Sequence, residues 1–408
     1  MNVVTLSWRY LWSRPLGTAL NLLLLALGLA SMALVLIARD QVERAFERDL
    51  AGIDVVVGAK GSPLQLILAG VFHLDVPPGN IPLAEADELA RHPQVAQLIP
   101  LSLGDNLQGF RIVGTTLDYP AHYGATLRSG SWWERPLQAV IGAQVAARTG
   151  LQTGQAFEGA HGLGHGGASH GDTPYTVAGV LAPCGCVLDR LILTSTESVW
   201  RVHDDMHAGS DMSEAERAEL DAALQDEREI TLALIRYRTP MAAVSFPRFV
   251  NGTTSMQAAA PAMEITRLLS LVGVVTQVLH GLTAVLLAVA GLSVFIALWS
   301  AVRERRGDLA MLRMLGAPPA RVGALLLCEA LWLALLACLL GLLAAHALTA
   351  FLGEMLTERH SLSISGWQWV SAEWWVPLLA FGVAVVSSLL PAVSAYRLDV
   401  TSLLNTTR

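Results

Sequence analysis

Seven histidine and cysteine residues between positions 161 and 207 are the side chains best suited to bind a metal ion. They are His161, His165, His170, Cys184, Cys186, His203 and His207. Imidazole nitrogens and thiolates are zinc ligands, and the glycines around the first three histidines would let the chain wrap around an ion without strain. The pattern predicts a low-affinity site for zinc or a similar metal. The alternative is a polar loop with no ligand, because ordering a glycine-rich segment costs conformational entropy.

The four cysteines do not have the pattern of a small disulfide-rich protein. Cys184 and Cys186 are separated by one glycine, and in an oxidising compartment they could be joined in a disulfide instead of binding a metal. Cys328 and Cys338 lie within an apolar stretch, where a free cysteine packs as a small hydrophobic residue.

The sequence contains no phosphate-binding loop. Residues 58–62 come nearest and include Lys60, the one lysine of the chain, but they lack the spacing that holds nucleotide phosphates. A zinc-protease helix and a nucleophile elbow are also missing. We therefore expect no catalytic residues and no directly bound cofactor, so that any ATP and magnesium would be bound by a partner chain.

Residues 303–317 form an arginine-rich segment between two long apolar stretches. A helix there would carry arginines on one side and apolar leucine and methionine side chains beside them, which suits docking to a protein partner. The residues expected at this docking surface are Arg303, Glu304, Arg305, Arg306, Asp308, Leu312, Leu315 and Gly316. The alternative is a solvated, positively charged flank with no partner.

Four stretches, 16–37, 268–301, 322–352 and 374–396, are long and apolar enough to cross a bilayer as helices. The first is expected to remain as an anchor, because it is longer than the usual core of a signal peptide. The expected fold class is a membrane protein with four transmembrane α-helices and a large α+β extracytoplasmic domain between the first and second helices.

Arginine placement predicts the orientation. Arginines are in excess in the N-terminal flank, in residues 302–322 and in the C-terminal tail, whereas residues 39–267 and 353–373 are acidic overall. We expect a bacterial inner-membrane protein with both termini in the cytoplasm, a periplasmic domain and no nucleic-acid partner.

The expected segments follow the four spans. They are 1–38 for the N-terminus and first span, 39–267 for the periplasmic domain with its stalks, 268–301 for the second span, 302–322 for the cytoplasmic loop, 323–352 for the third span, 353–373 for the external loop, 374–396 for the fourth span and 397–408 for the cytoplasmic tail.

Within the large domain, short strand-like runs alternate with helical segments. Strands are expected at 109–114, 139–142, 175–181, 191–194 and 231–237, and helices at 83–91, 144–149 and 213–228. Residues 240–261 are expected to be a linker, because proline and small polar residues recur in them. The apolar residues 64–72 could form a helix that faces lipid or substrate, or the floor of the domain.

Three ionisable side chains fall within the predicted spans. Glu329 lies near the cytoplasmic end of the third stretch, where pairing with the arginines of the loop could compensate its charge. His280 and His346 lie near the external ends of their stretches, so they could face one another, with interfacial packing as the alternative.

The sequence resembles the MacB/FtsX-like ABC transporter permeases, which include the lipoprotein-releasing LolC and LolE proteins. Three motifs are similar to sequence motifs of that family's external domain, at residues 139–142, 150–154 and 175–181. Residues 303–317 are similar to the family's coupling segment, and residues 390–404 to its C-terminal signature. The run that begins at Gly58 also resembles a subgroup associated with metal uptake or homeostasis.

The resemblance implies a permease subunit that couples ATP hydrolysis by a separate ABC ATPase subunit to work on an extracytoplasmic substrate, which in the metal subgroup would be metal-linked. It also implies a homodimer or a pair with a related permease, a periplasmic partner protein and contact with membrane lipids. Two alternatives remain. One is a permease that extracts lipoproteins or lipids through residues 64–72, and the other is a regulator of a periplasmic hydrolase that transports nothing.

Overall fold

The computed structural model describes residues 2–162, 173–208, 224, 227–360 and 365–397. The chain divides into two compact units. The first, here called the membrane unit, comprises Met1–Glu43 and Leu271–Arg408. The second, here called the sheet unit, comprises Arg44–Ser270.

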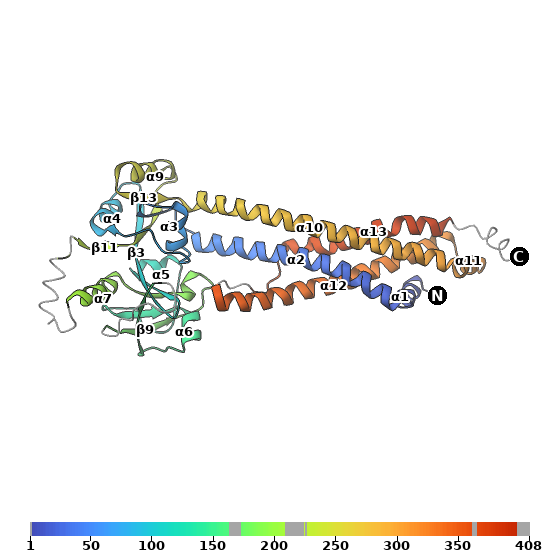
Figure 1. The fold of residues 1–408 in the computed structure, drawn as a ribbon, viewed down its shortest axis with the longest axis horizontal. Coiled ribbons are helices and arrows are strands. Elements are labelled where there is room, and N and C mark those ends of the chain that lie inside the picture. The colour runs from blue at the N-terminus through green and yellow to red at the C-terminus, as the bar shows by residue number, and fades with distance from the viewer. Residues whose placement is uncertain (1, 163–172, 209–223, 225–226, 361–364, 398–408) are drawn as a thin grey trace. The chain divides into compact units, whose positions relative to one another are not determined.

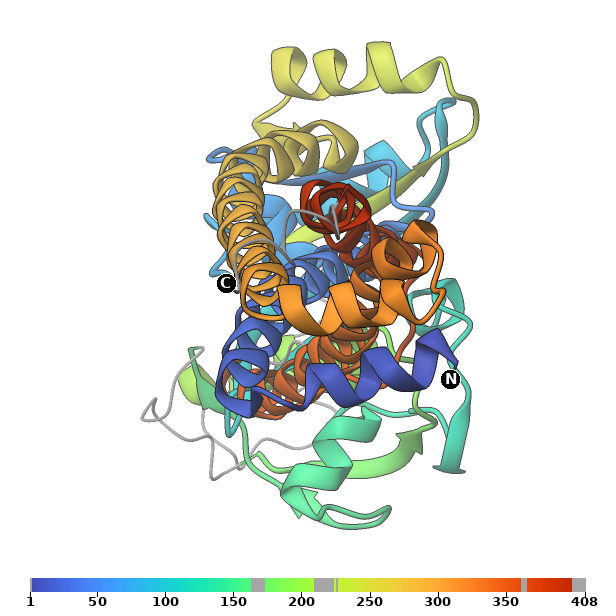
Figure 2. The ribbon, with the colours of Figure 1, turned by 90° about the vertical axis from the view of Figure 1, so that its right-hand side faces the viewer.

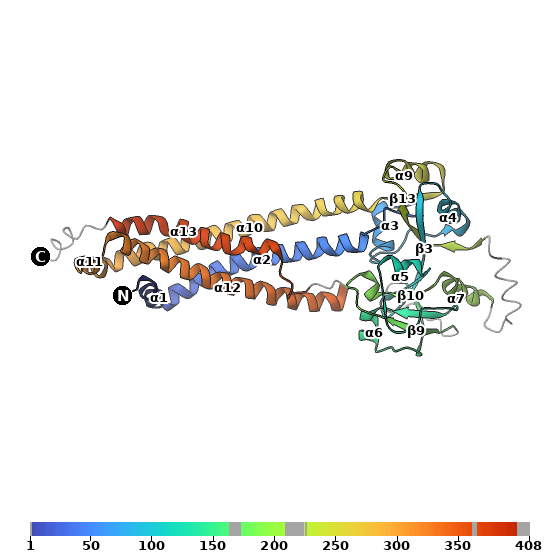
Figure 3. The same ribbon diagram turned by 180° about the vertical axis from the view of Figure 1, so that it is seen from behind.

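Four long helices dominate the membrane unit: α2 (Pro15–Leu50), α10 (Pro261–Glu304), α12 (Pro319–His360) and α13 (Trp375–Tyr396). Each is long and apolar enough to cross a membrane, so the four spans expected from hydropathy are confirmed in the described residues. Helices α12 and α13 pack side by side (Figure 3). The shorter elements are α1 (Val3–Leu11), α11 (Arg306–Met314) and the 3₁₀ turn η3 (Ser371–Trp374). Figure 2 looks along the long helices and shows α1 lying across their ends.

The core of the membrane unit is built on a regular stripe of α2. Leu25, Leu29, Ala33 and Ile37 recur every four residues, so they lie on one face, and all are buried against residues of α10, α12 and α13. Polar side chains fix the contact between α2 and α10, because Ser293 donates a hydrogen bond to Asn21 at 2.6 Å. Such interhelical hydrogen bonds are the usual polar glue of membrane helices.

The sheet unit contains an 11-stranded mixed sheet within the described residues. Its strands are β1 (Val55–Ala59), β3 (Val95–Leu107), β4 (Phe110–Thr115), β5 (Leu127–Gly130), β6 (Gln138–Ile141), β7 (Ala156–Phe157), β8 (Ala160–His161), β9 (Tyr175–Leu181), β10 (Ile192–Ser195), β12 (Leu232–Tyr237) and β13 (Met256–Ala259). The main order is β13-β1-β12-β3-β4-β10-β6-β9-β5, with β7 paired to β9 and β8 to β3. Strands β2 (Ile81–Pro82) and β11 (Glu229–Ile230) form a separate antiparallel pair. Two pairings, β4 with β10 and β6 with β9, are parallel.

Helices bury both faces of this sheet (Figure 1). On β1, Val56 packs with Leu66 and Ile67 of α3 (Pro63–Gly70), whereas Val55 and Val57 belong to the cluster on the opposite face. That cluster includes residues of α4 (Leu83–Ala90) and α9 (Ala242–Thr253). A strand buried on both sides is apolar throughout, which explains the run of three valines. The remaining helices are α5 (Asp118–His122), α6 (Ala143–Thr149), the 3₁₀ turn η1 (Val187–Arg190) and α7 (Thr196–Ala208).

The mixed α+β prediction for this unit is confirmed. All five expected strands occur, as β4, β6, β9, β10 and β12, and the helices expected at 83–91 and 144–149 are α4 and α6. The prediction of a linker at 240–261 is wrong, because α9 and β13 occupy it and β13 pairs with β1. Most of the helix expected at 213–228 lies outside the described residues.

The apolar segment 64–72 is part of the core. Leu66, Ile67 and Val71 are fully buried, and Phe72 is nearly so. The interpretation of this segment as the floor of the domain is therefore confirmed, and the interpretation as a surface facing lipid or substrate is wrong.

Candidate functional site

Helix α11 connects two membrane-spanning helices and presents an exposed apolar surface. Leu309 and Ala310 are buried, and Leu309 belongs to the core of the membrane unit. On the other side, Met311, Met314 and Leu315 have exposed fractions of 57%, 56% and 81%. Arg303, Arg306 and Asp308 are also exposed, so charged and apolar side chains are accessible together.

The end of α11 depends on a glycine. Gly316 has a φ of +91°, in the left-handed region that side chains other than glycine rarely adopt. Its amide donates to the carbonyl of Arg313, and the amide of Ala317 donates to that of Leu312, which satisfies the last carbonyls of the helix. This turn leads directly into α12, so Gly316 has a conformational role.

Arg305 points into the bundle rather than toward a partner. Its guanidinium donates to Oε1 of Glu329 at 3.0 Å, to the carbonyl of Tyr10 at 3.0 Å and to Oγ of Ser13 at 2.8 Å, and it lies over the ring of Tyr10. The exposed fractions of the Arg305 and Glu329 side chains are 13% and 5%. The arginine therefore connects α1, α12 and the turn between α10 and α11.

A second ion pair reinforces the same region. Arg14, between α1 and α2, pairs with Glu304 at the end of α10, and both side chains are partly exposed. Of the residues expected at the docking surface, Arg303, Arg306, Asp308 and Leu315 are accessible, whereas Leu312 packs partly against the core. Glu304 and Arg305 bind within the unit.

His346 and Glu373 form the other polar centre of the membrane unit. Nε2 of His346 lies 3.0 Å from Oε2 of Glu373, and Nδ1 lies 2.7 Å from the carbonyl oxygen of Gly366. Glu373 is fully buried, and its second oxygen accepts a hydrogen bond from the amide of Val370. These contacts fix residues 365–374 against α12. His280 is half-buried on α10, and no hydrogen bond joins it to His346 in the described part of the chain.

The candidate metal ligands are not brought together in the described residues. Cys184 and Cys186 are joined in a disulfide, and His161 pairs with Asp105 at 3.1 Å. His203 and His207 lie on α7, four residues apart, and His165 and His170 lie outside the described residues. Among the described residues, no group of three or more histidine, cysteine, aspartate or glutamate residues is arranged to hold a metal ion.

A buried polar cluster in the sheet unit was not predicted, because its residues form no sequence motif. Arg111 donates to the carbonyls of Ala69 and Asp75, and Arg190 donates to that of Phe72 at 2.6 Å. Arg111 therefore binds the last turn of α3, and both guanidiniums bind the segment that follows the helix. His73 is buried beside them. Burial lowers the pKa of His73 well below its usual value, and Arg111 and Arg190 lower this pKa further. Burial also lowers the pKa of Arg111 to about 10.

Comparison with known proteins gives two family matches. Residues 18–259 match the MacB-like periplasmic core domain, and residues 281–400 match the FtsX-like permease C-terminal family. No curated protein matches the sequence.

Two solved structures show limited similarity. The periplasmic region of MacB from Actinobacillus actinomycetemcomitans is 10% identical, with a TM-score of 0.33, and the match covers 54% of this chain and 95% of that structure. The extracellular domain of the noncanonic ABC-type transporter YknZ from Gram-positive bacteria is 11% identical, with a TM-score of 0.29 and coverages of 50% and 98%.

Proposed function

This chain belongs to the MacB/FtsX-like family of ABC transporter permeases, and we propose that it transmits the work of a separate ATPase to a substrate or partner on the periplasmic side. The family and the four apolar helices identify an inner-membrane protein with a periplasmic domain. Permeases of this family work with an ABC ATPase.

The exposed side of α11 is the surface at which the ATPase is proposed to bind. Met311, Met314 and Leu315 are exposed on a segment between two spanning helices. Burying these apolar side chains in a protein interface would remove them from water, which favours binding. An apolar helix face that enters a groove is a common mode of protein recognition. Arg303 and Arg306 would add charge complementarity at the rim, which favours the rate and orientation of docking more than affinity.

Movement of α11 would reach the neighbouring helices through Arg305. The guanidinium holds Glu329 of α12 and the carbonyl of Tyr10 at the end of α1. Since both bonds are partly buried and 3.0 Å long, a displacement of α11 would displace both helices. We assign Arg305 a positioning role, and the docking contacts themselves to its exposed neighbours.

Two helices continue from the membrane unit into the sheet unit. Helix α2 has 36 residues and α10 has 44, and the boundaries between the units fall within them. A continuous helix keeps every backbone hydrogen bond along its length, which makes it suitable for transmitting displacement. In the proposed mechanism α2 and α10 carry the movement to the periplasmic domain.

The proposed orientation places both termini and α11 in the cytoplasm. The arginine-rich flanks support it, because arginine is retained on the cytoplasmic side. The disulfide between Cys184 and Cys186 also supports it, since the sheet unit would lie in an oxidising compartment. The functional assembly would be two permease chains, identical or related, with two ATPase chains and a periplasmic partner.

The proposed substrate is an extracytoplasmic molecule or protein, and no narrower class is assigned. Lipid extraction through residues 64–72 is not proposed, because Leu66 and Ile67 are fully buried. A metal-linked substrate is not assigned either, because two of the candidate ligands are joined in a disulfide and a third pairs with Asp105.

The experiment is to measure ATP hydrolysis by the partner ATPase with and without this permease in lipid nanodiscs. Met314→Asp and Leu315→Asp place charge in the proposed interface and should weaken binding by about 2 kcal/mol or more, roughly thirtyfold. Arg248→Glu, at an exposed position of α9, is the control for a surface change in the sheet unit. Normal ATPase binding and stimulation in both α11 variants would refute the docking surface.

A further inference from the structure

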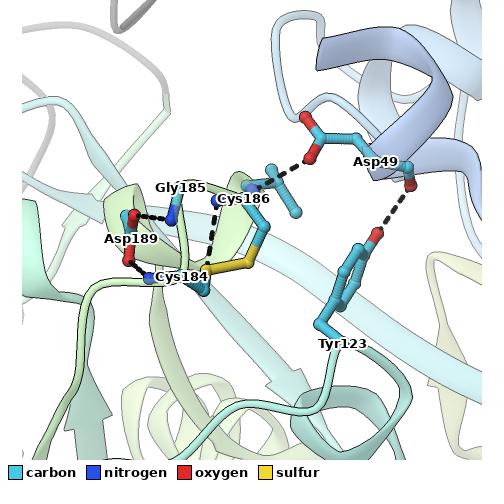
Figure 4. Close-up of a disulfide and its surroundings, with 7 residues drawn as sticks. Asp49, Tyr123, Cys184, Gly185, Cys186 and Asp189 are labelled. Atoms are coloured by element: carbon cyan, nitrogen blue, oxygen red, sulfur yellow. Dashed lines mark hydrogen bonds between the residues drawn. A yellow bond between two sulfur atoms is a disulfide. The ribbon is translucent and has the colours of Figure 1, made fainter. Parts of the chain in front are cut away.

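The disulfide between Cys184 and Cys186 closes a ring with one residue, Gly185, between the two cysteines (Figure 4). Gly185 is exposed and has a φ of +64°, a conformation that glycine adopts without steric cost. Both cysteines are only half-buried. The disulfide therefore lies at the edge of the core of the sheet unit, packed against the core on one side and partly accessible.

Two carboxylates hold the loop that carries the disulfide (Figure 4). Asp189 accepts hydrogen bonds from the amides of Cys184 and Gly185, at 2.9 and 2.7 Å. Asp49, in the last turn of α2, accepts a hydrogen bond from the amide of Val187 at 3.2 Å. The loop is thus connected directly to the end of α2.

A positive charge also lies beside the loop. A Cβ atom placed on Gly185 would be 3.2 Å from Nη1 of Arg48, so this guanidinium lies next to the residue between the cysteines. Guanidinium groups favour the thiolate form of nearby cysteines. If the disulfide opened, Arg48 would stabilise the sulfur that leaves as an anion.

The bond contributes little to holding the fold together. A disulfide stabilises a fold by lowering the conformational entropy of the unfolded chain, and this stabilisation grows with the logarithm of the number of residues in the closed loop. The loop between Cys184 and Cys186 is among the shortest possible, so its stabilisation is small. The neighbouring Val187 and Leu188 are buried in the core, so the sheet unit would stay folded without the bond while the loop itself became less constrained. An accessible disulfide with a small structural role is well suited to reversible chemistry.

We propose that Cys184 and Cys186 form a thiol–disulfide exchange site, reduced by a protein dithiol of the same compartment, whose opening releases the contact between this loop and the end of α2. A thiolate of the reductant attacks one sulfur and forms a mixed disulfide, while the other cysteine leaves as a thiolate and takes up a proton. The second thiol of the reductant then attacks the mixed disulfide. Two electrons and two protons pass to Cys184 and Cys186, and the reductant becomes a disulfide. This chemistry goes beyond the proposed coupling function and does not depend on the partner ATPase.

The experiment uses the full-length chain in nanodiscs without denaturant. The protein is incubated with reduced thioredoxin or with dithiothreitol, quenched with acid and alkylated, and the peptide that contains both cysteines is quantified by mass spectrometry. We expect reduction by both reagents and recovery of the disulfide on reoxidation. Arg48→Glu should slow reduction about tenfold by removing the charge that stabilises the thiolate. Arg44→Glu, the same change one turn earlier on α2, should react at the wild-type rate.

Hydrogen exchange of the same samples tests the connection to α2. Reduction should speed exchange in the peptides that contain Val187 and the last turn of α2, and Cys184→Ser/Cys186→Ser should reproduce this state. If the disulfide is reduced only after the protein unfolds, it is not a thiol–disulfide exchange site. If dithiothreitol reduces it but thioredoxin does not, the proposal of a protein reductant is wrong. If the oxidised and reduced proteins show identical hydrogen exchange, the proposal that reduction releases the loop from the end of α2 is wrong.

Discussion

Arg305 and Glu329 form a buried ion pair, with Nη1 of the arginine 3.0 Å from Oε1 of the glutamate. The pair joins the turn between α10 and α11 to the interior of α12. Neither side chain has enough access to water to keep its charge hydrated alone. Each group therefore depends on the other, and the position of α11 depends on both.

Arg305→Met should destabilise the permease strongly. The substitution retains the apolar stem of the side chain but removes the guanidinium, which leaves the Glu329 carboxylate buried without its partner. Removal of one member of a buried pair costs about 3–5 kcal/mol. Thermal unfolding of the detergent-solubilised protein measures this loss.

Two further variants make the test specific. Arg305→Met/Glu329→Leu removes both charges and should recover much of the lost stability, because no unpaired charge remains. Arg306→Met, at the exposed neighbouring arginine, should change stability by no more than about 0.5 kcal/mol. Equal stability of Arg305→Met and Arg306→Met would show that the buried pair has no structural role.

Hydropathy was sufficient to predict the membrane unit, but not the direction of its arginines. The four spans follow from length and apolar composition, because hydrocarbon admits few other structures. Arg303, Arg305 and Arg306 are nearly equivalent in sequence. What distinguishes Arg305 is the position of Tyr10 and Glu329, which are distant along the chain, so the inward orientation became evident only from tertiary contacts.

His346→Leu should release residues 365–374 from α12. The histidine contacts both Glu373 and the carbonyl of Gly366, so the substitution removes two hydrogen bonds and leaves a fully buried carboxylate with fewer partners. Loss of a hydrogen bond to a charged group costs about 1.5–3 kcal/mol. Hydrogen exchange in this segment should rise by roughly ten- to a hundredfold. Trp367→Ala, at a side chain with a 91% exposed fraction, is the control and should leave exchange unchanged.

In the sheet unit, regular apolar patterns were predictable and interrupted ones were not. The alternation of β9 predicted its bounds, whereas β3 contains Pro100 and several polar residues and was missed. Residues 240–261 resemble a linker because of their prolines, yet Pro247 lies inside α9 and Phe246 anchors that helix in the core. Burial against β1 outweighs the local preference for a turn.

The sheet unit should lose stability as the pH falls below about 6.5, in part because of His73. Its pKa is depressed in the folded protein, so below the ordinary value the unfolded chain binds a proton that the folded chain does not. Between pH 7.5 and 5.5 this difference should lower the unfolding free energy by about 1 kcal/mol. His73→Asn accepts the same positive φ and cannot titrate, so its unfolding free energy should depend less on pH by that amount. If the unfolding free energies of the wild type and His73→Asn depend on pH in the same way, His73 is not the group responsible for this loss of stability.

Two glycines of the α11 region should respond in opposite ways to alanine. Gly316 has a φ of +91°, so Gly316→Ala forces strain of about 1–3 kcal/mol at the turn into α12. Gly307 lies in the first turn of α11, and a Cβ there would meet no atom within 4 Å. Gly307→Ala should therefore stabilise the helix by about 0.5–1 kcal/mol. Thermal unfolding distinguishes the two variants, and a nanodisc ATPase assay should show reduced stimulation only for Gly316→Ala, since that change displaces the end of the helix that carries Met314 and Leu315. Loss of stimulation in the stabilised Gly307→Ala variant alone would instead indicate that the ATPase contacts the backbone at Gly307, and the docking surface would have to be moved to the start of α11.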